Sequence, residues 1–394
     1  MNFYKFLNFF DNRLRRGKPA SLYLNALFRN TALSLAGFFV PLYVFYLTKS
    51  LFWVLLYFTI FWGGNFLLTI FVAPLIYHLR FRRSILFSNF ILILKFIFLI
   101  FAKNNILLLI PAAVLSGLEI IFYWLPYHLI FTEDGAEGGF EEDVKIERML
   151  LRFSSVLAPF LGGVLISQVG FPFVYSLAAL LIFLSSIPLF ITHHHKDYGV
   201  PSPKRIIKGL KEKSDRNLLI SFFGQGINQI VWSICWPLFA FSILGSYQAL
   251  GGLTSGAVLF SLILLTQASR LTQKGKGGKA ILWGGTIAAI LWVFKAFAQT
   301  PISLFTFDAL QQGAWIFFIV PFSVFMYRQS LRSAYSFEFI IRREIALGGG
   351  RMLALFLLFT LFSLGISWVI IFSLGAIGII LATFSARRAM SSLH

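Results

Sequence analysis

The chain is 394 residues long, and 58% of them are hydrophobic while only 12% are charged. With a mean hydropathy of +0.80, it has more apolar surface than a water-soluble fold buries, so soluble classes of protein are excluded. The net charge of +19 would indicate nucleic-acid binding only if the basic residues gathered on a soluble surface. The single cysteine, Cys235, excludes an intrachain disulfide and a cysteine-rich metal site.

Residues 1–22 begin "MNFYKFLNFFDNRLRRGKPA", where charges interrupt the apolar residues every few positions. This pattern predicts an amphipathic segment on the inner membrane surface rather than a signal peptide. A membrane span needs roughly 20 apolar residues, and the remaining sequence contains twelve such stretches. They cover residues 23–47, 51–77, 84–102, 105–131, 150–168, 171–192, 218–243, 249–267, 280–298, 302–326, 347–366 and 368–386.

The distribution of Lys and Arg predicts which way the spans run. If the N-terminus lies inside, 29 of the 34 basic residues fall in or at the edges of the inner segments, and only Lys49 and Lys103 fall in outer loops. This satisfies the positive-inside rule with both termini in the cytoplasm. It also accounts for the net charge through topology and contact with anionic lipid headgroups, without nucleic acid. We expect an integral protein of a prokaryotic inner membrane.

The two halves of the sequence repeat each other. "FFVPLYVFYL" at 38–47 and "ICWPLFAFSI" at 234–243 place Pro41 and Pro237 at the same point, 196 residues apart. A second pair of similar segments is "PYHLIF" at 126–131 and "PFSVFM" at 321–326. A third pair is formed by the basic loops "HLRFRRS" at 78–84 and "KGKGGKA" at 274–280. We therefore predict an all-α membrane protein with two parallel six-helix repeats and a cavity between them. Its parts are bundles at 23–192 and 218–386, a cytoplasmic central loop at 193–217 and a cytoplasmic tail at 387–394.

This arrangement resembles the major facilitator superfamily over essentially the whole chain. The family's loop between the second and third spans reads Gly-x-x-x-Asp-Arg-x-Gly-Arg-Arg, and here it reads "PLIYHLRFRR". Arg82 and Arg83 match, but His78 replaces the acidic residue, so the family's acidic lock does not carry over to it. The basic residues either pair with acidic residues at the inner end of the fourth span or act only as topological anchors. The candidate gate residues are His78, Arg80, Arg82, Arg83, Glu133 and Asp134.

The fifth span contains "SSVLAPFLGGVL", which looks like the Gly-Pro-x-x-Gly-Gly element of the family's exporter branch. Pro159, Gly162 and Gly163 match, and Ala158 stands for the first glycine. Small residues allow close helix packing and proline weakens a helical hydrogen bond. The resemblance therefore implies export, although simple tight packing is the alternative. "YWLPYHLIF" and "EFIIRREIALGGGR" look like segments of poorly characterised prokaryotic members.

Ionisable residues within spans are functional candidates because burying them in a bilayer costs several kcal/mol. Glu119 lies near the middle of the fourth span and Arg29 about six residues into the first. Their depths differ by roughly 9 Å at 1.5 Å per residue, so the side chains can meet only if they lean together. We predict either a proton-coupling pair or a static ion pair that fixes helix register.

The seventh and tenth spans each carry a polar and aromatic stripe at helical spacing. Such a stripe is costly against lipid, so we expect the two stripes to face the cavity. Asp308 is also a candidate partner for Lys295 in an outer structural ion pair. The predicted cavity residues, with two aromatic residues of the fourth span, are Tyr123, Trp124, Gln225, Asn228, Gln229, Trp232, Trp236, Asp308, Gln311, Gln312 and Trp315.

Several chemistries find no support in the sequence. His193, His194 and His195 are consecutive and cannot converge on one metal ion, and the acidic run "EDGAEGGFEED" lacks the pattern of a calcium loop. "KGKGGKA" lacks the spacing of a nucleotide-binding loop. No Ser-His pair or paired carboxylates occur within the spans. We predict no metal, no cofactor and no enzymatic activity.

The sequence leaves three functional hypotheses. The first is a proton-linked secondary transporter, acting as a monomer, that exports an apolar or amphiphilic compound by alternating access. It rests on a cavity expected to have few charges and many aromatic residues, in a chain with 48 Phe. The second is a lipid or lysolipid flippase. The third is a non-transporting sensor or assembly protein, which the altered gate motif favours.

Overall fold

The computed structural model describes residues 20–138, 140–190, 199–213 and 215–391, with side chains except at residues 20, 133–138 and 140–142. The predicted N-terminal amphipathic segment at 1–19 and His193, His194 and His195 lie outside these residues. Within them the chain is helical and has no strand. The elements are α2 (Ala20–Leu35), η1 (Gly37–Phe39), α3 (Val40–Thr48), α4 (Leu51–Leu79), α5 (Phe81–Phe101), η2 (Ile106–Leu108), α6 (Leu109–Gly138), α7 (Phe140–Gln168), α8 (Phe171–Ser186), η3 (Ile187–Phe190), α9 (Pro203–Leu210), α10 (Arg216–Ile230), the π-helical η4 (Val231–Cys235), α11 (Trp236–Leu244), α12 (Tyr247–Gln273), α13 (Gly277–Lys295), α14 (Pro301–Arg332), α15 (Ser336–Ser363) and α16 (Trp368–Ser391).

Twelve helical segments of the described chain are long and apolar enough to cross a membrane, which confirms the predicted all-α membrane fold. Several begin one to three residues earlier than the sequence predicted, and two begin much earlier. The fifth starts at Asp143 rather than 150, and the eleventh at Ser336 rather than 347. Both added segments are rich in charge, which the hydropathy of the sequence assigns to loops. In the structure the helices continue through both segments, and several of their charged side chains are buried, namely Asp143, Glu147, Glu338, Arg342 and Glu344.

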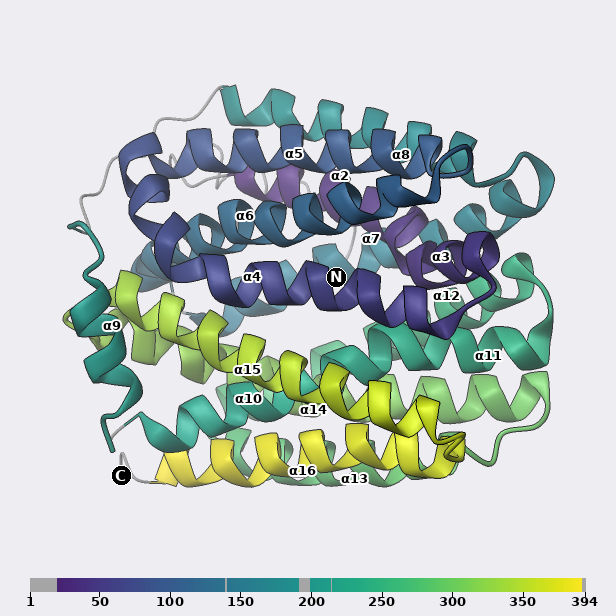
Figure 1. Cartoon of the computed structure of the whole chain (residues 1–394). Coiled ribbons are helices and arrows are strands. Elements are labelled where there is room, and N and C mark those ends of the chain that lie inside the picture. The colour runs from purple at the N-terminus through teal and green to yellow at the C-terminus, as the bar shows by residue number, and fades with distance from the viewer. Residues whose placement is uncertain (1–19, 139, 191–198, 214, 392–394) are drawn as a thin grey trace, which may run out of the picture.

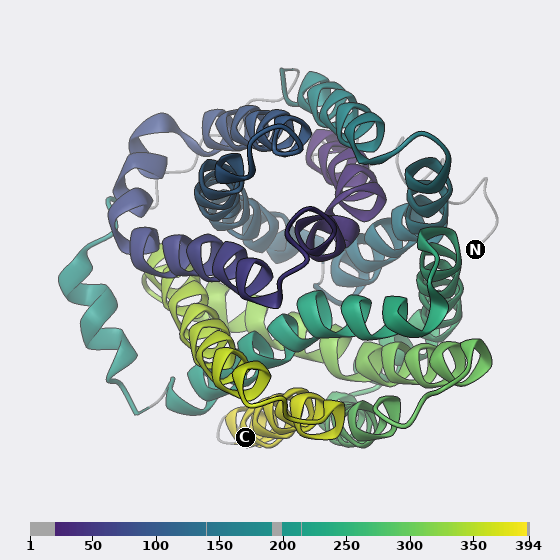
Figure 2. The ribbon, with the colours of Figure 1, turned by 45° about the vertical axis from the view of Figure 1, so that its right-hand side comes forward.

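The helices lie in two groups, with α2 to α8 on one side of the molecule and α10 to α16 on the other (Figure 1). Between the groups, α7 packs along α12 and α4 packs along α15, and the rotated view shows the same division (Figure 2). The end at which α4 meets α5 and α12 meets α13 carries Arg80, Arg270 and Lys274 and lies beside α9. We call it the basic end.

The repeated proline has the same structural role in both halves. In the first span α2 gives way to the 3-10 turn η1, and α3 then begins with Pro41 in its first turn. In the seventh span α10 gives way to η4, and α11 begins with Pro237 in its first turn. Proline is tolerated there because the first turn of a helix has no acceptor for its missing N–H. The repeat therefore marks an interruption of regular α-helix at mid-span.

Candidate functional site

A cavity of about 390 Å³ lies between the two groups of helices. Its walls come from α4, α6 and α7 on one side and from α10, η4, α14 and α15 on the other. The size is within the range of small-molecule sites, about 300–1,000 Å³. The lining residues are Trp62, Ile120, Trp124, His128, Glu147, Arg148, Arg152, Gln225, Asn228, Gln229, Trp232, Gln311, Gln312, Trp315, Ile319, Arg343, Glu344, Leu347 and Arg351.

The structure brings most of the predicted cavity residues together on this lining. Tyr123, Trp236 and Asp308 are different, because they are buried behind the wall rather than in it. Helical direction explains this for Tyr123, since Ile120, Trp124 and His128 of α6, spaced four residues apart, form the face that lines the cavity. The predicted residues that line it are Trp124, Gln225, Asn228, Gln229, Trp232, Gln311, Gln312 and Trp315.

The charge of the cavity differs from the sequence expectation. Four arginines and two glutamates line it, so the expectation of few charges was wrong. These arginines lie near the inner ends of the fifth and eleventh spans, where the positive-inside rule accounts for them by topology alone. Their helical spacing was the signal that could have found them, since residues four or seven apart share a face. The residues concerned are Glu147, Arg148, Arg152, Arg343, Glu344 and Arg351.

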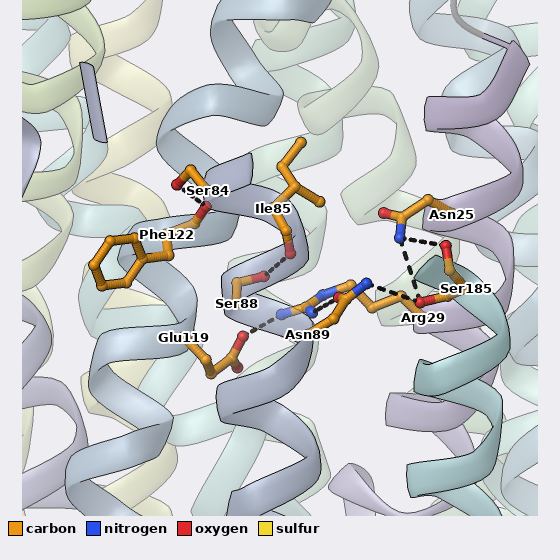
Figure 3. Close-up of polar contacts among 9 residues, drawn as sticks. All are labelled: Asn25, Arg29, Ser84, Ile85, Ser88, Asn89, Glu119, Phe122 and Ser185. Carbon is orange, nitrogen blue, oxygen red and sulfur yellow. Dashed lines mark hydrogen bonds and ion pairs between the residues drawn. The ribbon is translucent and has the colours of Figure 1, made fainter. Parts of the chain in front are cut away.

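Arg29 and Glu119 meet inside the first group of helices (Figure 3). Arg29 on α2 forms an ion pair with Glu119 on α6, and its second guanidinium nitrogen donates a 2.8 Å hydrogen bond to Asn89 on α5. The two charged residues are 2% and 3% exposed, so water does little to screen their attraction. The guanidinium carbon lies 3.9 Å from the centre of the Tyr123 ring. The two side chains therefore do lean together, in a pocket of polar and aromatic groups.

A short series of contacts connects this pair with the cavity. The ring of Tyr123 stacks on that of Tyr127 with centroids 5.5 Å apart. The Tyr127 hydroxyl donates a 3.1 Å hydrogen bond to Glu147, which lines the cavity. Two side chains, Tyr123 and Tyr127, thus lie between the Arg29 ion pair and the cavity wall.

A second buried ion pair lies in the other group of helices. Nζ of Lys295 is 2.7 Å from Oδ1 of Asp308, and both side chains are fully buried. The ammonium lies 3.9 Å from the centre of the Trp236 ring. Gln312 donates a 2.9 Å hydrogen bond to Asp308, and Arg152 on α7 donates one of 2.8 Å to Gln312. The pair thus connects, through one amide, with a cavity arginine of the opposite group.

Toward the basic end, buried residues of α6 and α14 join the two groups of helices. Nδ1 of His128 and the Tyr327 hydroxyl are hydrogen bonded at 2.8 Å. Phe131 packs on the Tyr327 ring with centroids 4.5 Å apart. We call His128, Phe131 and Tyr327 the closing layer. At the other end of the cavity Trp232 is 38% exposed.

The predicted gate residues at the basic end are not brought together within the described side chains. His78, Arg80 and Arg83 are exposed. The guanidinium carbon of Arg82 lies 5.7 Å from the centre of the Phe190 ring. The remaining candidates, Glu133 and Asp134, have side chains outside the described set, so their pairing with the arginines stays a prediction.

The motif Pro159, Gly162 and Gly163 lies where α7 approaches other helices most closely. A side-chain carbon on Gly162 would collide with the Leu35 carbonyl, and one on Gly163 with the Tyr247 carbonyl of α12. Pro159 faces a similar glycine on α12, because a side-chain carbon on Gly251 would collide with its carbonyl. The small residues therefore allow the backbones of α7 and α12 to touch across the two groups.

Solved structures with this arrangement identify the fold. FucP, a major facilitator superfamily transporter in the outward conformation, matches with a TM-score of 0.69 and 14% identity over 94% of this chain and 98% of that chain. The fold is that of the major facilitator superfamily. A second structure of FucP, the Escherichia coli fucose:proton symporter, gives 0.68 and 16% over 94% and 98%. A bacterial homologue of the iron transporter ferroportin in the outward-facing state gives 0.69 and 15% over 95% and 99%.

Comparison with the sequences of known proteins does not identify a function. No protein-family model matches the chain. YqgE of Bacillus subtilis (strain 168), an uncharacterized protein, is 24% identical over 253 residues, which cover 61% of this chain and 58% of that protein. The match thus spans less than two thirds of the relative's length. The resemblance to the superfamily drawn from the sequence is confirmed at the level of fold.

Proposed function

We propose that this protein is a proton-coupled secondary transporter that moves an amphiphilic organic compound by alternating access. The observation that carries the proposal is the cavity itself, which both groups of helices line with aromatic and polar side chains. A site shared by two bodies can open to either side when one body rocks against the other. The major facilitator fold supports a transporter rather than an enzyme.

Proton coupling is assigned to Glu119. A proton on this carboxylate would cancel the charge that holds Arg29 and so weaken the ion pair. The change would pass through Tyr123 and Tyr127 to Glu147 at the cavity wall, along contacts that are already in place. If transport is coupled to this proton, its rate depends on the pH gradient. A static pair that only fixes the register of α2 and α6 predicts no dependence of transport on the pH gradient.

The proposed orientation places the basic end in the cytoplasm and the protein in a prokaryotic inner membrane, as the positive-inside rule favours. The closing layer then shuts the cavity toward the cytoplasm. Export is the proposed direction, because the motif of Pro159, Gly162 and Gly163 resembles that of exporters. The same motif brings the backbone of α7 against that of α12, where the two groups of helices would slide during transport.

Exchange of compounds across proteoliposomes tests the transport step. Vesicles with the purified protein are loaded with naphthalene derivatives bearing a sulfonate, a carboxylate, an amine or no charge, and exchange of internal for external compound is followed. Protein-dependent exchange of at least one compound is expected. Movement of a fluorescent phospholipid without exchange of any compound would instead establish a flippase, and absence of both would contradict transport.

A further inference from the structure

The cavity carries more positive charge than its own carboxylates neutralise. Glu147 forms an ion pair with Arg148, at 3.6 Å between Oε2 and Nε. Glu344 pairs with Arg343 and lies 3.7 Å from Arg351. Four guanidinium groups and two carboxylates leave an excess of two positive charges on the lining. Such an excess between membrane helices is costly unless something of opposite charge offsets it.

The arginines also hold hydrogen-bond donors that the described residues do not use. Nε of Arg343 is buried and donates no hydrogen bond within the described part of the chain. Nε of Arg148 is also buried, and Oε2 of Glu147, at 3.6 Å, is too far away to accept a hydrogen bond from it. Arg148 donates one bond of 3.0 Å, to Ser323 of α14, and Arg152 donates one of 2.8 Å, to Gln312. Each guanidinium group has five N–H donors. Buried donors of this kind are expected to have acceptors, so the site has capacity for an acceptor-rich group.

The same cavity offers aromatic surface beside the arginines. Four tryptophans line it, two from each group of helices. The guanidinium carbon of Arg351 lies 4.1 Å from the centre of the Trp62 ring, so cationic and aromatic surfaces are continuous there. A ligand that fits both must combine an aromatic or apolar body with an anionic group. The tryptophans are Trp62, Trp124, Trp232 and Trp315.

We propose that the ligand of this cavity is a water-soluble amphiphilic organic anion, bearing a sulfonate, carboxylate or phosphate on an aromatic or apolar body. The anionic group lies among Arg148 and Arg152 of α7 and Arg343 of α15, and the body packs on the tryptophans. This inference deepens the proposed function and rests on it. Because the arginines come from both halves, a bound anion is attracted to both at once, which favours the closed arrangement.

The test compares two probes with one ring system, 8-anilinonaphthalene-1-sulfonate and its uncharged counterpart N-phenyl-1-naphthylamine. Binding is measured by energy transfer from tryptophan in phosphatidylcholine nanodiscs, with protein-free nanodiscs subtracted. The sulfonate is expected to bind at least about tenfold more tightly, as one charged hydrogen bond is worth roughly that factor. Arg148→Gln and Arg152→Gln should each remove about tenfold of the sulfonate's affinity and leave the neutral probe unaffected. Arg270→Gln, at an exposed position, is the matched control.

Each other outcome overturns the inference in an identifiable way. Equal binding of the two probes, or sulfonate binding that both variants retain, would show a cavity that does not select anions, and the transporter proposal would stand. Binding of neither probe would overturn the anion assignment, while the exchange assay would still decide transport. Displacement of the sulfonate when the nanodisc contains phosphatidylglycerol would assign the site to a lipid headgroup instead. Cooperative unfolding with unchanged midpoint identifies variants that remain folded.

Discussion

His128 and Tyr327 form a 2.8 Å hydrogen bond between α6 and α14, and both side chains are buried. The bond joins the two groups of helices at the basic end of the cavity. Because a buried hydrogen bond contributes about 0.5–1.5 kcal/mol, its removal should shift the balance between closed and open basic ends by roughly two- to tenfold. Tyr327→Phe removes the hydroxyl and keeps the ring packed on Phe131.

The shift can be measured by double electron–electron resonance between two spin labels. Spin labels at the exposed positions Arg83 and Arg332 report the separation of the two groups at the basic end. Tyr327→Phe should enlarge the population with the longer distance, and Tyr335→Phe, at an exposed tyrosine, should not. Identical distance distributions for Tyr327→Phe and the unmodified protein would refute the role of the closing layer.

The ion pair of Lys295 and Asp308 leads to a stability prediction. Both side chains are fully buried, so Asp308→Ala leaves an ammonium without its counter-ion and should lower the free energy of unfolding by about 3–5 kcal/mol. Changing both residues together, Lys295→Met with Asp308→Leu, should recover most of that loss because no charge is left unpaired. Unfolding in mixed micelles measures both effects. A double variant as unstable as Asp308→Ala would disprove this reasoning.

A larger side chain at position 163 should hinder the movement of the two groups of helices relative to each other. A side-chain carbon there meets the Tyr247 carbonyl of α12, so Gly163→Leu should force α7 and α12 apart at a cost of about 1–3 kcal/mol. We expect exchange in proteoliposomes to fall at least fivefold. At Gly64, where an added side-chain carbon has open space, Gly64→Ala should leave exchange unchanged. Full exchange by Gly163→Leu would show that close approach at this point is not required.

The fold was predictable from the sequence because each span carries its own signal. Hydropathy predicts the twelve spans, and the separation of 196 residues between Pro41 and Pro237 indicates the repeat. The closeness of Arg29 and Glu119 was predictable only as a possibility, since depth along two helices says nothing of the angle at which they face each other. The structure supplies that angle.

The charge of the cavity was not predictable by the same reasoning. Arg152 and Arg351 were attributed to topology, because a basic residue near the inner end of a span has the same sequence signature whether it faces lipid headgroups or a cavity. Which face it occupies depends on how the helix is rotated against its neighbours. That rotation is a tertiary property, and hydropathy does not record it.

The decisive measurement of proton-coupled transport is compound-dependent proton movement in proteoliposomes that enclose a pH-sensitive dye. An amphiphilic compound that exchanges is added in the presence of a proton gradient, and dissipation of the gradient is compared between the unmodified protein and Glu119→Gln. The exposed Glu212 provides the control variant Glu212→Gln. Coupling through Glu119 predicts that the compound accelerates proton movement in the unmodified protein and in Glu212→Gln but not in Glu119→Gln. Equal acceleration in all three proteins would contradict coupling through Glu119 and leave its pair with Arg29 as a static contact.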